Sequence, residues 1–233
     1  MALAFRAAGA IASGFAQTLE VALPAGTTDG DFLIIAAYCS DNRNITTPEA
    51  GWTSETTVMS SVAGDSAVAF MHTIASSESG TYTVNMDGGA DKTMYAVMLA
   101  YSGADQTTPQ DAAFTNNFDV ANSSSHNPAA ITTVTDDAIV VSICGATQTT
   151  ASPGTPPSGY TLRAENGSTH YLGVADKAVA SAGVEDPGNW TSLGSGADSE
   201  SITLAIRPAA AASGSSPKGP LGHVLRGPLG GPI

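Results

Sequence analysis

The chain has 233 residues, and its 8 Lys and Arg against 21 Asp and Glu give a formal net charge of −13. Only 12% of the residues are charged, against about 25% in an average soluble domain. So few basic residues cannot supply the cationic footprint that nucleic acid requires. No apolar run approaches the about 20 residues of a membrane span, and two cysteines cannot staple a disulfide scaffold. The composition predicts a globular protein that binds neither nucleic acid nor membrane.

Residues 1–14 are rich in Ala and predict an N-terminal arm or a first strand. A secretory signal places its charge before a strongly apolar core, whereas Gly9 and Ser13 interrupt the weakly apolar stretch here. We therefore expect no signal peptide and synthesis in the cytoplasm. In that compartment Cys39 and Cys144 are expected to be buried free thiols, and a disulfide between them is the lesser alternative.

Short apolar runs dominate the first half of the chain. They are rich in Val, Ile, Thr and aromatic residues, and clusters of Gly, Pro, Asn, Asp and Ser separate them, as is typical of antiparallel strands. The predicted strands of this half are 18–23, 32–39, 52–59, 67–74, 82–86 and 93–101.

The second half continues in the same way. Asn166-Gly167 lies between two of its apolar runs, and this dipeptide predicts a hairpin with a two-residue turn, because Asn and Gly tolerate positive φ. The predicted strands of this half are 138–143, 160–165, 169–175, 178–182 and 201–207.

Both halves follow one pattern. Asp31 opens a strand and Trp52 follows 21 residues later, while Asp137 opens a strand and Tyr160 follows 23 residues later. Because two facing sheets can bury a shared core, we predict an all-β fold, an antiparallel β-sandwich of jelly-roll type, over residues 15–208. It is expected to consist of two similar halves, 15–104 and 115–208.

Several turn and strand-end motifs of the first half carry a resemblance: Leu23-Pro24-Ala25-Gly26, Gly30-Asp31, Thr46-Thr47-Pro48, Gly51-Trp52-Thr53 and Ala100-Tyr101-Ser102-Gly103. This pattern resembles a β-sandwich domain that recurs in tailed-bacteriophage virion proteins and in some bacterial surface proteins. The resemblance implies a non-enzymatic structural protein on the outer surface of the virion, made in the host cytoplasm. Its implied partners are other virion proteins and further copies of itself, by analogy as a trimer. We favour a capsid decoration (cement) protein, with a tail-associated virion protein as the alternative.

The composition changes at residue 209. Ala, Ser and Gly predict a flexible linker, and two Gly-Pro-Leu-Gly repeats follow in a segment that cannot form its own core. We hypothesise that residues 209–233 form an extended tail that docks on a neighbouring subunit. The residues expected to dock are Pro220, Leu221, Val224, Leu225, Pro228, Leu229 and Ile233.

A search for catalytic chemistry gives no constellation. No Gly-X-Ser-X-Gly nucleophile elbow is present. The four histidines, at positions 72, 126, 170 and 223, lack zinc-ligand spacing. The acidic loop from Asp87 to Asp91 lacks the alternation of a calcium-binding EF-hand. We predict no enzyme activity, no metal site and no cofactor.

Three aromatic residues leave one binding function open. Trp52, Tyr160 and Trp190 could stack on sugar rings, which would make the chain a carbohydrate-binding or adhesin module for a host-surface glycan. We favour core packing for all three, because aromatic residues make up only 6% of the chain and an extended sugar-binding surface needs more of them.

Overall fold

The computed structural model describes residues 2–47, 49–58, 66–119, 123–147, 153–194 and 198–210. Within these ranges the chain forms sixteen strands, and every strand pair is antiparallel. The predicted all-β antiparallel class is therefore confirmed. The same ranges contain no helix that could cross a membrane.

The first half of the chain forms one large and one small sheet. The large sheet has the order β1 (Ala4–Ala8), β9 (Lys92–Ser102), β4 (Phe32–Cys39), β7 (Ala67–Ile74) and β6 (Thr53–Val58), and β2 (Ala12–Ala16) also pairs with β9. The small sheet has the order β3 (Thr18–Ala22), β8 (Thr81–Met86) and β5 (Ile45–Thr46).

The second half forms an equivalent pair of sheets. Its large sheet has the order β10 (Thr115–Asp119), β16 (Ser199–Ile206), β12 (Ala138–Thr147), β14 (His170–Val179) and β13 (Thr161–Gly167). Its small sheet contains β11 (Ile131–Thr133) and β15 (Gly183–Glu185). Two isolated β-bridges, from His126 to Trp190 and from Thr155 to Thr191, also occur in this half.

The strand order of the second half repeats that of the first. The central strand β4 lies between β9 and β7, as β12 lies between β16 and β14. The strand that precedes each central strand, β3 or β11, pairs with the strand that follows β7 or β14. This correspondence lies in the topology, although the sequences of the matched strands differ.

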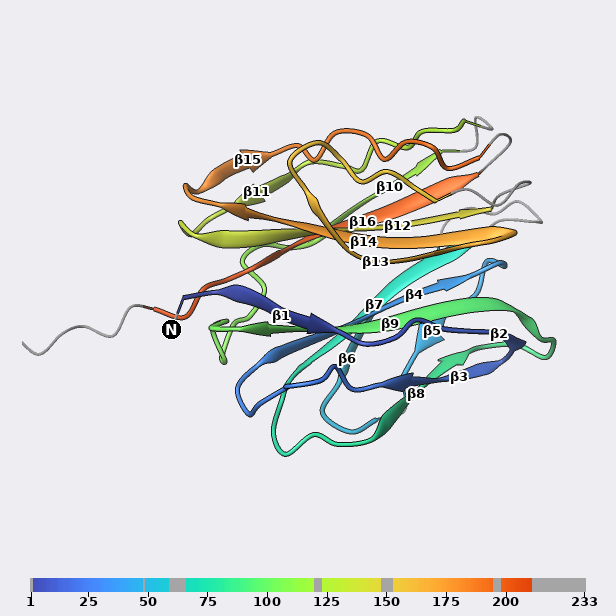
Figure 1. Ribbon diagram of the computed structural model, residues 1–233, viewed down its shortest axis with the longest axis horizontal. Coiled ribbons are helices and arrows are strands. Elements are labelled where there is room, and N and C mark those ends of the chain that lie inside the picture. Colours follow the sequence, from blue (N-terminus) through green and yellow to red (C-terminus); the bar gives the residue numbers. More distant parts are fainter. Residues whose placement is uncertain are drawn as a thin grey trace, which may run out of the picture.

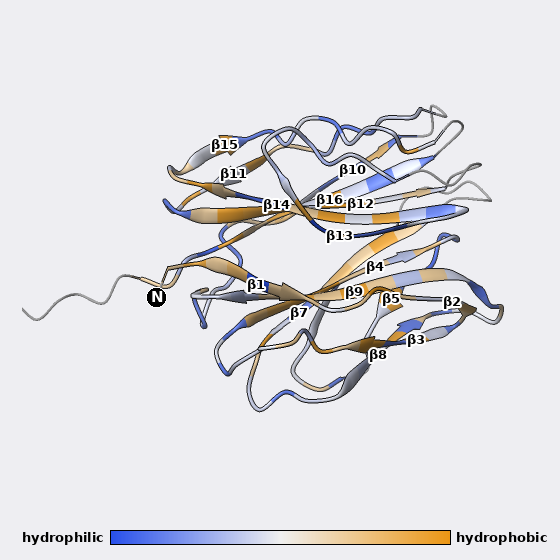
Figure 2. Ribbon diagram, in the orientation of Figure 1, coloured by the Kyte–Doolittle hydropathy of each residue, from blue (hydrophilic) through white to orange (hydrophobic). Residues whose placement is uncertain are grey.

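Figure 1 shows the sheets as stacked layers, with the two large sheets facing each other and a small sheet outside each. All eight residues of β4 are buried. Alternate side chains of a strand point to opposite faces, and both faces of β4 are covered by other sheets. Phe32 and Ile34 join the core between the large sheets, while Leu33 and Ile35 join the core under the small sheet. The central strands are accordingly among the most hydrophobic parts of the ribbon (Figure 2). The predicted two-sheet sandwich lacked these outer layers.

The two halves approach closely between β4 and β12. A Cβ atom at Gly145 would lie 2.5 Å from the Tyr38 ring and 2.5 Å from a Val68 methyl group. Tyr101 of the first half donates a hydrogen bond to Asp176 of the second at 3.1 Å, and Arg163 pairs with the same carboxylate at 2.8 Å. The shared core therefore holds the halves together as one packed unit.

Several sequence predictions need correction. Residues 4–8 and 12–16 are strands of the first large sheet, in agreement with the first-strand alternative for residues 1–14, so the sheet begins before the predicted boundary at residue 15. The predicted strand 178–182 does not form, because β14 continues to residue 179 and a turn follows. Asn166 and Gly167 pair with Leu172 and Tyr171 inside the hairpin, so the loop lies two residues later than predicted.

Candidate docking face

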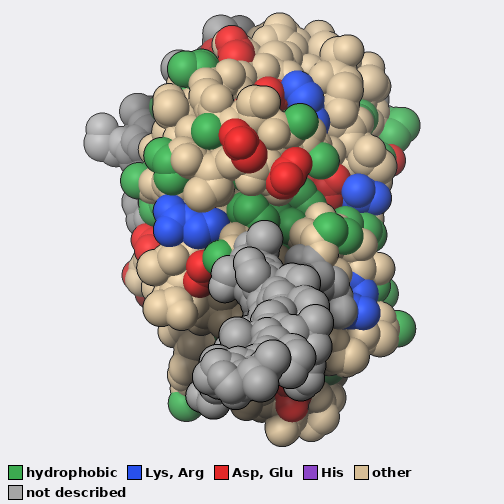
Figure 3. Space-filling model, turned by 90° about the vertical axis from the view of Figure 1, so that its left-hand side faces the viewer, with side chains coloured by type: hydrophobic (Ala, Val, Ile, Leu, Met, Phe, Trp, Pro, Cys, Tyr) green, Lys and Arg blue, Asp and Glu red, His purple; other side chains and the backbone are tan. Residues whose placement is uncertain are grey.

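Both ends of the described chain lie on one face of the molecule, which we call the terminal face and define by the residues that line its two pockets. Residues 2 and 210 line the same pocket there. Hydrophobic side chains gather near the middle of this face, with acidic side chains above them and basic side chains on either side (Figure 3). The face therefore combines an apolar surface with charged margins.

The segment that leaves β16 is held at this face by backbone hydrogen bonds. Arg207 N donates to Pro109 O at 2.8 Å, and Asp105 N donates to Arg207 O at 2.9 Å. Ala209 N then donates to Gly103 O at 2.8 Å. The exit segment is therefore fixed along the connection between the halves until residue 209.

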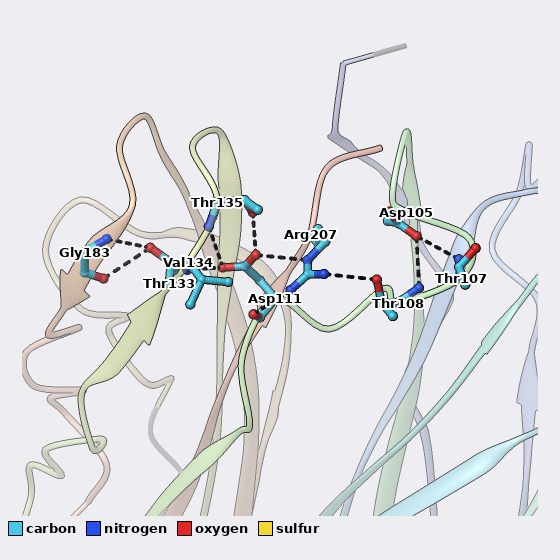
Figure 4. A network of polar contacts seen from close by, with 9 residues as sticks. All are labelled: Asp105, Thr107, Thr108, Asp111, Thr133, Val134, Thr135, Gly183 and Arg207. Atoms are coloured by element: carbon cyan, nitrogen blue, oxygen red, sulfur yellow. Dashed lines mark hydrogen bonds and ion pairs between the residues drawn. The ribbon is translucent and has the colours of Figure 1, made fainter. Parts of the chain in front are cut away.

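Buried Asp111 lies at the centre of the polar network in Figure 4. Its carboxylate accepts a hydrogen bond from Val134 N at 2.6 Å and another from Thr135 N at 3.2 Å. It also accepts from the Thr135 hydroxyl and from Arg207 Nε, the latter at 3.3 Å. One carboxylate thus joins the connection between the halves, the turn before β12 and the exit segment.

The guanidinium of Arg207 completes this network. Its Nη2 donates to the Asp111 carbonyl at 3.1 Å, and its Nη1 donates to the Thr108 hydroxyl at 3.1 Å. Thr108 lies in a turn that begins at Asp105. The Asp105 carboxylate accepts hydrogen bonds from Thr107 N at 2.8 Å and from Thr108 N at 2.9 Å (Figure 4). Charge-assisted hydrogen bonds of this kind are stronger than neutral ones.

The protonation of both aspartates follows from these bonds. Burial raises the pKa of Asp111, but the hydrogen bonds from Thr135, Val134 and Arg207 outweigh it, so that the pKa lies below the ordinary value. The backbone N–H groups of Thr108 and Thr107 likewise lower the pKa of Asp105. Both side chains are therefore anionic at neutral pH.

A pocket of about 870 Å³ opens beside the exit segment. Its walls are mostly apolar and include Leu3, Val179 and Pro208, while Asp136 and Asp137 contribute carboxylates. Both aspartates are exposed, and they follow Thr135, which the Asp111 carboxylate holds in place. The polar network around Asp111 thus holds two parts of the pocket lining, the turn at residues 135–137 and the exit segment at residues 208–210.

A smaller pocket of about 240 Å³ lies on the other side of Ala209. Arg6 and Asp31 line it, and they form an ion pair with Nε and Oδ2 2.6 Å apart. Asp31 Oδ2 also accepts from Thr28 N at 2.9 Å. Arg6 and Asp31 in this pocket therefore bind one another, whereas the walls of the larger pocket are mostly apolar.

The predicted docking residues of the tail lie outside the described residues, as does every position after 210. Of the aromatic candidates, Trp190 is fully buried and Tyr160 is 8% exposed, so neither presents a ring face to a sugar. Trp52 is half-buried and packs on Tyr82, with ring centroids 5.5 Å apart. The rings of Tyr160 and Trp190 pack in the outer core of the second half, as we favoured, so neither is available for the alternative of glycan stacking.

The remaining reactive side chains are separated from one another. Cys39 and Cys144 are buried free thiols, and they face different cores on opposite sides of the shared one. Burial raises the pKa of Cys39 to about 12. His72 contacts Gln110 and His170 contacts Thr169, so the two histidines form no joint site. Within the described residues, no three His, Cys, Asp or Glu side chains are grouped to hold a metal ion.

Comparison of the chain with protein-family models, with curated proteins and with solved structures found no significant match. The fold class, an all-β protein of stacked antiparallel sheets, therefore rests on the strand pairing alone. Sequence reasoning missed Asp111, Arg207 and the pocket, because their contacts join positions nearly 100 residues apart. The pattern that could have suggested them is Arg207 at the end of the last strand, where the composition changes.

Proposed function

We propose that the protein is a non-enzymatic structural component of a tailed-phage virion, a decoration protein on the outer surface of the capsid. Its C-terminal tail docks on a neighbouring subunit. The sheets support the jelly-roll type of two similar halves, because the first half pairs a large antiparallel sheet, β1-β9-β4-β7-β6, with a smaller one, β3-β8-β5, as a double-sheet jelly roll does. The motif resemblance described above supports the placement on a virion.

The observation that carries the proposal is the anchored exit of the chain. The exit segment is hydrogen-bonded to residues 103–109 up to Ala209, and Asp111 and Arg207 brace it from the side. A tail that starts from so rigid a base can transmit force to the body without loosening it. This is what a protein that clamps a particle surface requires.

The distribution of charge supports the same role. The two basic residues of the tail are Lys218 and Arg226, and the tail has no acidic residue, so residues 1–210 carry a formal charge of −15. Each of the six Lys and Arg side chains in that range pairs with a carboxylate of the described residues: Arg6, Arg43, Lys92, Arg163, Lys177 and Arg207. The body is therefore an acidic surface to which nucleic acid and anionic envelopes do not adhere.

Immunogold labelling of particles tests the placement. Antibodies against the purified protein are applied to phage particles released from cells that carry the gene, and we expect many gold grains on the heads. Labelling confined to tails would overturn the capsid placement in favour of the tail-associated alternative. Labelling of the cell envelope without particles would overturn the virion role.

Deletion of residues 213–233 tests the tail. We expect the shortened protein to be lost from purified particles, because the apolar burial of the tail contributes about 25 cal/mol per Å² in each copy. Incorporation at full occupancy would show that the tail does not dock.

A further inference from the structure

The pocket beside the exit segment has the chemistry of a peptide receptor. Its volume of about 870 Å³ lies within the range of ligand pockets, about 300–1,000 Å³. Ala178, Val179 and Ala180 form one wall, and Pro208 lies on another. Asp136 Oδ1 accepts from Ala182 N at 2.8 Å, which fixes the direction of that carboxylate at the rim.

The tail has the complementary composition. Residues 217–233 contain no acidic side chain, and their two cations, Lys218 and Arg226, flank or adjoin the apolar residues. The six basic side chains of the described residues each pair with a carboxylate already. The apolar residues available for the pocket are Leu221, Val224, Leu225, Leu229 and Ile233.

The position of the exit decides how the tail can be shared. The chain leaves at Ala210, which itself lines the pocket, so each copy has its receptor and the origin of its tail on one face. Two copies that face each other with this surface can exchange tails in equivalent ways. Such an isologous arrangement is the commonest among homo-oligomers, and exchange of identical segments is a low-cost route to it.

We propose that the pocket lined by Leu3, Val179 and Pro208 receives apolar side chains from residues 217–233 of a second copy, with Arg226 placed against Asp136 and Asp137. This inference rests on the proposed docking of the tail and names its receptor. Apolar burial holds the segment, and the acidic rim selects its direction.

Disulfide trapping in the full-length chain tests the inference. The variant carries Ala180→Cys, an exposed position that lines the pocket, together with Leu225→Cys in the tail. Cys39 and Cys144 are buried and stay in place. The matched control carries Gly89→Cys with Leu225→Cys, because Gly89 has open space around it and negative φ.

Under mild oxidation we expect covalent dimers on a non-reducing gel, formed at least tenfold faster than in the control. Mass spectrometry should find the 180–225 cross-link between copies, and Asp136→Asn with Asp137→Asn should slow it severalfold. A fast 180–225 disulfide within one chain would overturn the exchange, because the tail would then occupy its own pocket. Equal rates in variant and control would overturn the receptor.

The two proposals fail separately. If the 180–225 cross-link does not form but gold labels the phage heads, the virion role stands and this pocket is excluded as the receptor. With the cross-link, absence of the protein from particles would leave tail exchange standing and exclude the virion role.

Discussion

His126 makes the stability of the fold depend on pH. Its ring is 1% exposed, with Nδ1 2.9 Å from the Ser199 hydroxyl and Nε2 2.7 Å from the Ser201 hydroxyl. Burial lowers the pKa of His126 to about 4, and the negative charge of Asp119 opposes this shift only in part. In an unfolded chain the pKa of histidine is about 6.5. The folded state therefore keeps the ring neutral where the unfolded state protonates it.

The magnitude follows from this difference. Because the folded pKa is the lower one, the unfolded state binds more protons between pH 6.5 and pH 4, and stability falls as the pH falls through that window. One pKa unit corresponds to about 1.4 kcal/mol, so the shift to about 4 predicts a loss of about 3 kcal/mol. The loss is complete below pH 4 and absent above pH 7.

Urea unfolding at several pH values between 7 and 4 measures this effect. The wild-type protein and His126→Gln are compared at each pH, so that contributions of the other titrating groups cancel in the difference. We expect the variant to be less stable at pH 7, where it loses hydrogen bonds to two buried serines, and to lose about 3 kcal/mol less on acidification.

Parallel stability curves for the two proteins would refute this account. Where the variant does not fold, an NMR titration of the wild-type imidazole gives the same test. A midpoint near 6.5 in the folded protein would show that burial does not lower the pKa of His126.

Three further predictions concern the packing and the brace. Asp111→Ala should lower the free energy of unfolding by about 3 kcal/mol in urea titrations, because it leaves the partly buried Arg207 without its carboxylate. An unchanged midpoint would contradict a stabilising role for the contact between Asp111 and Arg207. Gly145→Ala should cost about 1–3 kcal/mol, since its Cβ would overlap the facing sheet, whereas Gly89→Ala serves as the neutral control in the same thermal melts. Cys39 and Cys144 should stay unreactive toward a thiol reagent at pH 8 until denaturant is added, and rapid native labelling would show that they are accessible.

The long central strands were predictable because their signal is local. Strands 32–39 and 67–74 agree with the observed bounds of β4 and β7, since strands buried on both faces are continuous apolar runs between turn residues. The short edge strand β10 gave no such signal. β10 has the sequence Thr-Asn-Asn-Phe-Asp, and it is a strand only because it pairs with β16.

The docking face was beyond sequence reasoning for a different reason. Turn chemistry predicted the turn at Asn166-Gly167, but both residues pair with β14 and the loop follows them, because the dipeptide alone does not report how far the strand pairing extends. The contact from Arg207 to Asp111 spans 96 positions. Only the strand order brings these side chains together, and that order depends on how the two halves pack.

The sharing of one core by the two large sheets has a consequence for synthesis. The first half leaves the ribosome before the second, and its Phe32, Ile34 and Phe70 side chains then face water where the second sheet will later pack. Until residues 138–206 are available, this surface is open to other nascent chains. Slow translation of the second half should therefore raise aggregation, and a fragment that ends near residue 104 should require a chaperone to stay in solution.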